Sequence, residues 1–260
     1  MTSSHESDYV RRFYRDWLSD SDLYRFRVAV GESDLQISVS QGELLFEEAD
    51  GPDISGLKEV VVEELMRVRR SLRTYIERYP EFLTSLRPIE VADDAPPVVQ
   101  DMASAASLVG VGPMAAVAGA IAHSVGAMLA NSFTDVIVEN GGDLFVQSAS
   151  SRVIGVYCGR NSKLTGRLAL RLDADRFPVG VCTSAGTVGP SLSFGSADAV
   201  TVVSKRPSLA DAAATAIGNQ VKSIEDIPRA LEFASGIHGV EGVIVVKDDK
   251  LGVWGQVELV

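Results

Sequence analysis

The sequence has few cysteines and no excess of positive charge. Its 260 residues include two cysteines, too few for a disulfide framework, and we expect Cys158 and Cys182 to be buried free thiols in strand-like surroundings. The formal net charge of −11 makes nucleic acid or an anionic membrane surface a poor partner. The first residues are polar and acidic and lack the apolar run of a secretory signal, which favours a cytoplasmic protein.

Long apolar runs and nucleotide-binding motifs are also scarce. Residues 103–130 form the most apolar stretch, but two glycines and Pro113 interrupt it, so we expect a buried helix and no membrane span. No Walker A loop, dinucleotide glycine fingerprint or nucleophile elbow occurs. Neither His123 nor His238 has a Cys or His at metal-ligand spacing, which favours structural roles for both.

What the sequence does contain is a large apolar fraction. Hydrophobic residues make up 46% and charged residues 23%, which is the balance of a globular protein that buries a sizeable core. No Pro/Gly/Ser-rich linker divides the chain. We therefore expect one domain over residues 1–260, with two interleaved lobes as the alternative.

Hydrophobic periodicity predicts an α/β fold of the α+β kind, in which helices pack on an extended sheet. Alternating side chains predict a hairpin of strands at 24–30 and 34–39, and apolar residues at three- and four-residue steps predict a helix at 57–79. Further helices are expected at 97–109, 114–130, 208–219 and 227–235. Further strands are expected at 135–139, 144–148, 153–157, 168–172, 177–182 and 199–204, with a final hairpin at 242–246 and 251–254. Small side chains let the helix at 114–130 approach its neighbours closely, which places it in the middle of the fold.

A paired-glycine turn is the first candidate site. Asn140, Gly141, Gly142 and Asp143 follow the strand at 135–139. The glycines let the backbone adopt positive φ and let a ligand approach closely, while Asn140 and Asp143 add polar groups beside the gap. An ordinary tight turn between two strands is the alternative.

A hydroxyl-rich loop is the second candidate site. Residues 182–195 include three serines and two threonines, and such a loop can offer N–H groups to a phosphate or carboxylate. The loop is long for a simple strand connection, and long ordered loops are often functional. The candidate ligand-binding residues in it are Thr183, Ser184, Gly186, Thr187, Ser191 and Ser193.

A carboxylate and a hydroxyl on one helix are the third candidate site. Asp211 and Thr215 lie four residues apart in the helix at 208–219, so their oxygens share a face and suit a hard cation such as Mg²⁺. In the alternative, Ser208 is the N-cap, Asp211 completes a capping box, and Thr215 bonds back to the preceding turn. Periodicity alone favours this capping alternative.

Three of these pieces, in this order, resemble the ApbE superfamily, whose best-known members are Mg²⁺-dependent flavin transferases that move FMN from FAD onto a protein threonine. Residues 138–144 are similar to the paired-glycine turn of that family, and Asp211-Ala-Ala-Ala-Thr215 has the spacing of its metal-binding Asp and Thr. The small-residue helix takes the place of a segment that also supplies a main-chain carbonyl to the metal. The resemblance extends over residues 104–219 and raises the Mg²⁺ hypothesis for Asp211 and Thr215 above the capping alternative.

A closer resemblance is to the UPF0280 branch. It rests on the string Cys-Thr-Ser-Ala-Gly-Thr-Val-Gly-Pro-Ser-Leu-Ser-Phe-Gly over 182–195, followed by Leu-Ala-Asp-Ala-Ala-Ala-Thr-Ala-Ile-Gly-Asn over 209–219. Ala118 stands where the transferases carry a lysine, and residues 189–195 take the place of their His followed by Asp-Pro-x-Thr-Gly. Because the transferases use these elements around the flavin nucleotide, the resemblance does not imply FMN transfer or a bound flavin.

The leading hypothesis is an ApbE-like protein that binds a small phosphorylated or carboxylated ligand with Mg²⁺ and acts on it, with catalytic residues that the sequence does not identify. The UPF0280 resemblance implies a place in sulfur assimilation, in the formation of homocysteine. One alternative is a flavin transferase with an altered site. Another is a non-catalytic subunit that assembles with other proteins, and a homodimer or a protein partner is an open expectation.

Overall fold

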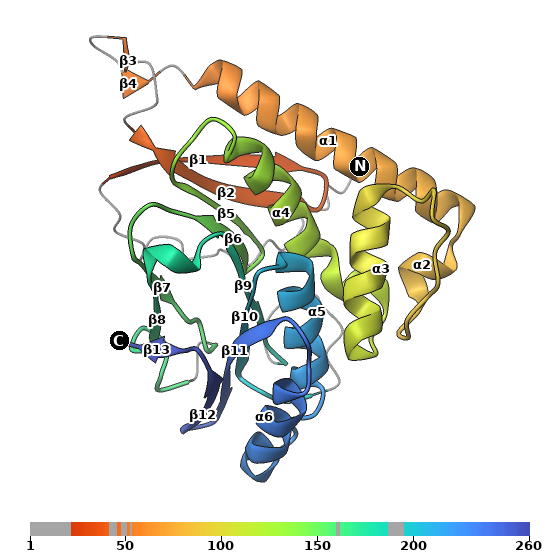
Figure 1. The fold of residues 1–260 in the computed structure, drawn as a ribbon, viewed down its shortest axis with the longest axis vertical. Helices are drawn as coiled ribbons and strands as arrows, with labels where there is room; N and C mark the ends of the chain where they lie inside the picture. The colour runs from red at the N-terminus through yellow and green to blue at the C-terminus, as the bar shows by residue number, and fades with distance from the viewer. Residues whose placement is uncertain (1–21, 42–45, 48–50, 53, 160–161, 187–194) are drawn as a thin grey trace, which may run out of the picture.

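The centre of the fold is an antiparallel sheet of eight strands. The computed structural model describes residues 22–41, 46–47, 51–52, 54–159, 162–186 and 195–260 (Figure 1). The strands of the main sheet are β1 Leu23–Val30, β2 Ser33–Ser40, β5 Val136–Asn140, β6 Asp143–Gln147, β9 Val179–Ser184, β10 Ala199–Ser204, β11 Val240–Lys247 and β12 Lys250–Gly255. Their order is β1-β2-β5-β6-β9-β10-β11-β12, and each neighbouring pair is antiparallel.

Helices cover one face of the main sheet (Figure 1). The helices are α1 Ser55–Arg78, α2 Glu81–Thr84, α3 Pro97–Val109, α4 Val117–Leu129, α5 Pro207–Gly218 and α6 Ile227–Ser235, with short 3-10 turns at Pro113–Ala116, Ala174–Arg176 and Ile224–Asp226. Helix α1 packs on β1, α4 on β5 and β6, α5 on β9 and β10, and α6 on β11 and β12. Helix α3 packs against α5, so α4 and α5 lie at the centre of the helical layer.

A smaller sheet lies on the opposite face. Its strands are β7 Arg152–Gly155, β8 Ala169–Leu172 and β13 Glu258–Leu259, in the order β13-β8-β7. Leu170 and Leu172 of β8 pack with Val179 and Val181 of β9 in one buried cluster. The main sheet is therefore apolar on both faces, and two short strands, β3 Phe46–Glu47 and β4 Gly51–Pro52, pair apart from it.

Small residues allow α4 to approach the sheet and α5. A Cβ added to Gly126 would lie 2.1 Å from Cδ1 of Phe145, and one added to Gly119 would lie 2.3 Å from the carbonyl oxygen of Pro207. Such distances are shorter than carbon atoms tolerate, so both positions need glycine. The expected central position of the small-residue helix is confirmed.

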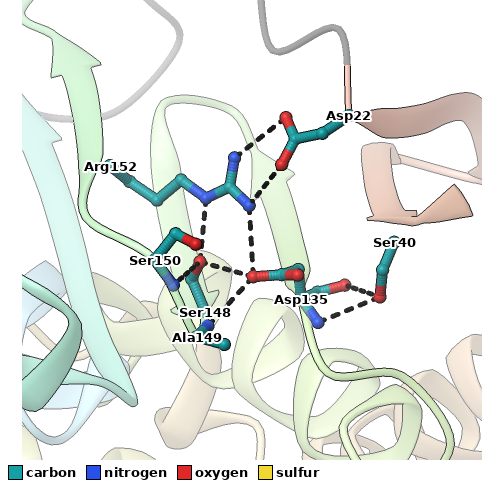
Figure 2. Close-up of polar contacts among 7 residues, drawn as sticks. All are labelled: Asp22, Ser40, Asp135, Ser148, Ala149, Ser150 and Arg152. Atoms are coloured by element: carbon teal, nitrogen blue, oxygen red, sulfur yellow. Dashed lines mark hydrogen bonds and ion pairs between the residues drawn. The ribbon is translucent and has the colours of Figure 1, made fainter. Parts of the chain in front are cut away.

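A buried arginine joins the two sheets (Figure 2). Arg152, the first residue of β7, donates Nη1 and Nη2 to the carboxylate of Asp22 at 3.2 and 2.9 Å. Its Nη2 also lies 3.1 Å from Oδ1 of Asp135, and its Nε donates to Oγ of Ser148 at 2.8 Å. Asp22 precedes β1, Asp135 precedes β5 and Ser148 follows β6, so one side chain links four strands.

The main strand and helix predictions are confirmed, but two features differ. The strands predicted at 153–157 and 168–172 form the separate smaller sheet and do not extend the main one. The chain does not end as a hairpin, because β13 continues after β12 and pairs with β8. A two-residue period identifies a strand but not the sheet that it joins.

Other expectations concern the cysteines and the apolar stretch. Cys158 and Cys182 are both buried and free, as predicted, although Cys158 lies beyond the end of β7. Within the described ranges no single helix has the length and apolarity to cross a membrane. Helix α3 and the segment Pro113–Leu129 meet those criteria only as a pair, which is bent by 105°. The single domain stays a prediction.

Candidate functional site

The paired-glycine turn joins β5 and β6 and is tied to the start of α4. Gly141 and Gly142 have φ values of +74° and +106°, which glycine adopts without strain. The N–H of Gly142 donates to Oε1 of the buried Glu139 at 2.8 Å. The side-chain amide of Asn140 donates to the carbonyl of Ala118 at 3.2 Å. The turn is therefore fixed by one hydrogen bond to Glu139 of β5 and by another to the main chain of α4.

Asp143, the last residue of this turn, contacts β9. The residue is only 8% exposed, and its Oδ1 accepts the main-chain N–H of Thr183 at 3.2 Å. Successive side chains of β6 point to opposite faces of the sheet, and Leu144 packs toward the smaller sheet. The carboxylate of Asp143 therefore faces the helical layer, on the same face as Phe145. The hydroxyl of Thr183 instead pairs with the hydroxyl of Thr201 at 2.9 Å, on the other face.

Helix α5 runs along β9 in the same direction. A Cβ on Gly180 would lie 2.4 Å from Cα of Pro207, and the thiol of Cys182 lies 3.4 Å from the carbonyl oxygen of Pro207. Near the far end of β9, Oγ of Ser184 lies 4.0 Å from where a Cβ on Gly218 would be. The first turn of α5 is thus next to Asp143, and its last turn is next to the start of the hydroxyl-rich loop.

The carboxylate of Asp211, on α5, lies beside the first turn of α4. The N–H of Gly119 donates to Oδ2 of Asp211 at 2.9 Å. Ala116 is the N-cap of α4 and provides no side-chain cap. The N–H groups in the first turn of α4 can therefore donate to acceptors from other elements. A carboxylate is favoured there by these donors and by the helix dipole. Asp211 therefore accepts a hydrogen bond at the start of a helix that is 92 residues away in the sequence.

Two carboxylates repel each other at this junction. Burial, and next the charge of Asp143, raise the pKa of Asp211 well above its usual value, while the main-chain N–H groups of Gly119 and Ala118 oppose the shift. Burial and the same two carboxylates raise the pKa of the Cys182 thiol. No basic side chain is among the groups that shift the pKa of Asp211. A bound cation would relieve the repulsion.

The capping alternative for α5 is wrong. The helix begins at Pro207 with Arg206 as its N-cap, and no side chain caps it. Ser208 lies inside the first turn, fully buried, and its hydroxyl has no hydrogen-bond partner among the described residues. Thr215 lies one turn beyond Asp211 on the same face and is half-buried. In the described part of the chain its hydroxyl makes no bond back to the preceding turn, so both side chains stay candidates for a metal site.

The structure places only part of the hydroxyl-rich loop. Ser184 ends β9, and the N–H of Gly186 donates to the carbonyl of Ala197 at 2.9 Å. At the other end of the loop, a Cβ on Gly195 would lie 1.8 Å from the carbonyl oxygen of Gly218. Both ends of the loop thus lie near the last turn of α5. The remaining predicted ligand-binding residues, which lie outside the described residues, are Thr187, Ser191 and Ser193.

The candidate site therefore has two ends along α5. Asn140 to Asp143, the N–H of Thr183 and Asp211 meet near the first turn, whereas Ser184 and Gly186 lie toward the last. Sequence reasoning missed Glu139, a charged residue that follows three apolar residues of β5, and it missed that Ala118 and Gly119 contact the site through their main chains. The resemblance indicated a main-chain carbonyl from the small-residue helix, but no sequence signal marks which residues of that helix make the contacts.

The donor set suits a hard cation. Carboxylates, a hydroxyl and main-chain carbonyls are the oxygen ligands that Mg²⁺ takes, usually with several waters. Among the described residues no group of three or more His, Cys, Asp or Glu side chains could hold a metal. A metal here would therefore rely on one or two carboxylates together with hydroxyl, carbonyl and water oxygens.

Known proteins share this architecture. The flavin transferase ApbE from Vibrio cholerae aligns over 89% of this chain and 96% of its own with a TM-score of 0.54 and 12% identity. The ApbE protein from Thermotoga maritima aligns over 88% and 96% with a TM-score of 0.58 and 12% identity. The chain thus has the ApbE fold, which at these identities says nothing of its activity.

Sequence relatives define the family. The family model described as AbpE bacteria matches residues 15–243. A UPF0280 protein of Methanocaldococcus jannaschii is 44% identical over 212 residues, 79% of this chain and 85% of the relative. A UPF0280 protein of Methanosarcina barkeri is 43% identical over 197 residues, 75% and 77% of the two chains. The chain belongs to the UPF0280 family of ApbE-like proteins.

Proposed function

We propose that this protein binds a divalent cation at Asp211 and Thr215, binds a small phosphorylated or carboxylated ligand beside it, and acts on that ligand with transferase-like chemistry. The observation that carries the proposal is the half-buried carboxylate of Asp211, which accepts the N–H of Gly119 and has the charge of Asp143 next to it. Thr215 adds a hydroxyl one turn further on the same helix face. When bound, the cation would neutralise these charges and offer open positions to an anion.

The proposed order of binding follows from the hydrogen bonds of the site. The N–H of Gly142 already donates to Glu139, that of Gly119 to Asp211, and that of Thr183 to Asp143. These donors are engaged inside the protein, and the net charge of −11 disfavours anions. An anionic ligand should therefore need the cation as a bridge, so cation binding precedes ligand binding.

A thermal-shift titration tests the proposal, because a ligand that binds the native state raises the unfolding midpoint. Mg²⁺ or Mn²⁺ alone should raise the midpoint, pyrophosphate alone should not, and the two together should raise it further. Asp211→Asn should abolish the cation-dependent shift. Asp249→Asn, the same change at an exposed position in the β11–β12 turn, should leave it intact. An equal shift in Asp211→Asn and the wild type would contradict the proposed site.

Flavin transfer is a second candidate because the fold is that of flavin transferases. Adding FAD to the same titration distinguishes it, since binding with release of AMP would favour transfer. Ala118, which stands where the resemblance expects a lysine, presents its carbonyl to Asn140 and has no side chain that reaches a nucleotide. We therefore expect little or no release of AMP. A midpoint that no cation or anion moves, together with co-purification of another protein, would favour an assembly subunit.

A further inference from the structure

Two carboxylates from different layers of the fold meet at the candidate cation site. Asp211 comes from α5 and Asp143 from the first position of β6. Asp143 is fixed by the N–H of Thr183 on the neighbouring strand, and Asp211 by the N–H of Gly119 on α4. Asp143 is paired with Asn140, whose side-chain amide donates to α4, so both carboxylates lie near the start of that helix and their charges act on each other.

We infer that Asp143 is a second carboxylate ligand of the cation, which then joins β6 to α5. The inference rests on the cation site proposed above and assigns the site a new residue from the sheet. With two carboxylates the protein supplies two negative charges to a divalent ion, and charge count is one of the properties that set the affinity of such sites.

The hydrogen bond from Thr183 does not require the charge of Asp143. An asparagine could accept the same N–H of Thr183 through its side-chain oxygen, without a buried charge next to Asp211. The tight turn does not need Asp143 either, because Glu139 accepts the N–H of Gly142. A buried carboxylate beside a like charge lowers stability unless a cation offsets it.

A buried hydroxyl nearby also lacks a partner. Ser208 lies three residues before Asp211 on the same face of α5, it is fully buried, and its Oγ has no hydrogen-bond partner among the described residues. Unpaired buried polar groups are rare in native proteins and call for an explanation such as an ion or a water. A water bound to the cation would be a suitable partner for this hydroxyl.

Direct measurement of Mn²⁺ affinity tests the inference. Isothermal titration of the full chain with Mn²⁺ should show that Asp143→Asn weakens binding at least about tenfold, as expected for the loss of one charged ligand. Asp249→Asn is the matched control, since it is the same change at an exposed position in the β11–β12 turn, outside the candidate site. This control should bind Mn²⁺ as the wild type does.

A second measurement separates a ligand from a structural residue. In the absence of cation, Asp143→Asn should raise the unfolding midpoint, because it removes repulsion from Asp211 and keeps an acceptor for the N–H of Thr183. A merely structural role predicts a lower midpoint. Mg²⁺ should also shift the amide resonances of Thr183 and Gly119 together in the wild type, since each N–H donates to one of the two carboxylates.

The outcomes distinguish the inference from the function on which it rests. If the wild type binds no Mn²⁺, both fail. If Asp211→Asn loses Mn²⁺ binding while Asp143→Asn binds within twofold of the wild type, the cation site stands and the role of Asp143 is refuted. Loss of binding in both variants, with Asp249→Asn unchanged, supports a cation held between β6 and α5.

Discussion

Replacement of Arg152 by methionine should weaken the junction between the two sheets. Methionine keeps an unbranched side chain out to the position of Nε and removes the charge and the donors of the guanidinium group. The substitution removes the ion pair of Asp135 with Arg152 and the N–H that Arg152 donates to Ser148, while Asp22 loses its bidentate contact. The variant therefore tests whether this network (Figure 2) stabilises the fold.

The size of the effect follows from exposure. Removing one partner of a fully buried ion pair typically costs 3–5 kcal/mol, so that value is roughly the upper limit here. The side chain of Asp22 is 58% exposed and will regain water, and Asp135 keeps hydrogen bonds from Ser148 at 2.5 Å and from Ala149 at 3.0 Å. We therefore expect a loss of about 2–3 kcal/mol, or roughly 4–12 °C in the unfolding midpoint of a chain this long.

Urea unfolding monitored by circular dichroism measures the loss, provided that the slope with urea is unchanged. Asp22→Asn is the matched control and should cost less than about 1 kcal/mol, because an exposed ion pair contributes little. A loss below about 0.5 kcal/mol in Arg152→Met, which is the range of ordinary surface substitutions, would refute the reasoning. An equal loss in the two variants would also refute it, because the buried contacts with Asp135 would then contribute nothing.

The same network predicts a dependence on pH. The hydrogen bond from Arg152 lowers the pKa of Asp22, and hydrogen bonds from Ser148, Ala149 and Arg152 outweigh burial and lower the pKa of Asp135. The native state therefore binds these protons less readily than the unfolded state. The stability contributed is present above the unfolded pKa of about 3.8 and is lost as the pH falls through the lower native values. Arg152→Met should lose less stability than the wild type over that acidic range.

Three further substitutions test the packing and the charges of the site. Asp211→Asn should raise the unfolding midpoint of the cation-free protein near neutral pH. Burial and Asp143 raise the pKa of Asp211, so stability that is present below its unfolded pKa of about 3.8 is lost as the pH rises. An unchanged or lower midpoint by differential scanning fluorimetry would contradict this. Gly126→Ala should cost about 1–3 kcal/mol in urea unfolding, because its Cβ would lie 2.1 Å from an aromatic ring. Gly56→Ala, with nothing within 4 Å of its Cβ, is the control and should not destabilise. Gly142→Ala should cost about 1–3 kcal/mol, because φ is +106° there, and a neutral result would argue against that backbone conformation.

Local sequence patterns predicted the helices and strands better than the face of the sheet on which each side chain lies. The strand at 177–182 was correctly predicted, but β9 extends to Ser184. Thr183 therefore belongs to the strand, and alternation turns its hydroxyl toward Thr201 and away from Asp211. A strand end misplaced by one or two residues is enough to give a side chain the wrong surroundings.

The partner of Asp211 could not be predicted from the sequence either. The spacing of Ser208 and Asp211 suggested a capping box, because both residues are typical of helix starts. Asp211 does accept a hydrogen bond at a helix start, but the helix is α4 and the donor is Gly119. Local sequence records which side chains favour a helix terminus and does not record which terminus is nearby after folding.

The hydrogen bonds of the two carboxylates decide which substitutions are informative at this site. Alanine at Asp211 would remove the charge and also the acceptor for Gly119, so a loss of binding could reflect a loosened α4. Asparagine keeps an oxygen for that N–H, and the same holds for Asp143 and the N–H of Thr183. Because the isosteric amides change the charge and little else, weaker cation binding in a variant that is more stable without cation can be assigned to the lost charge.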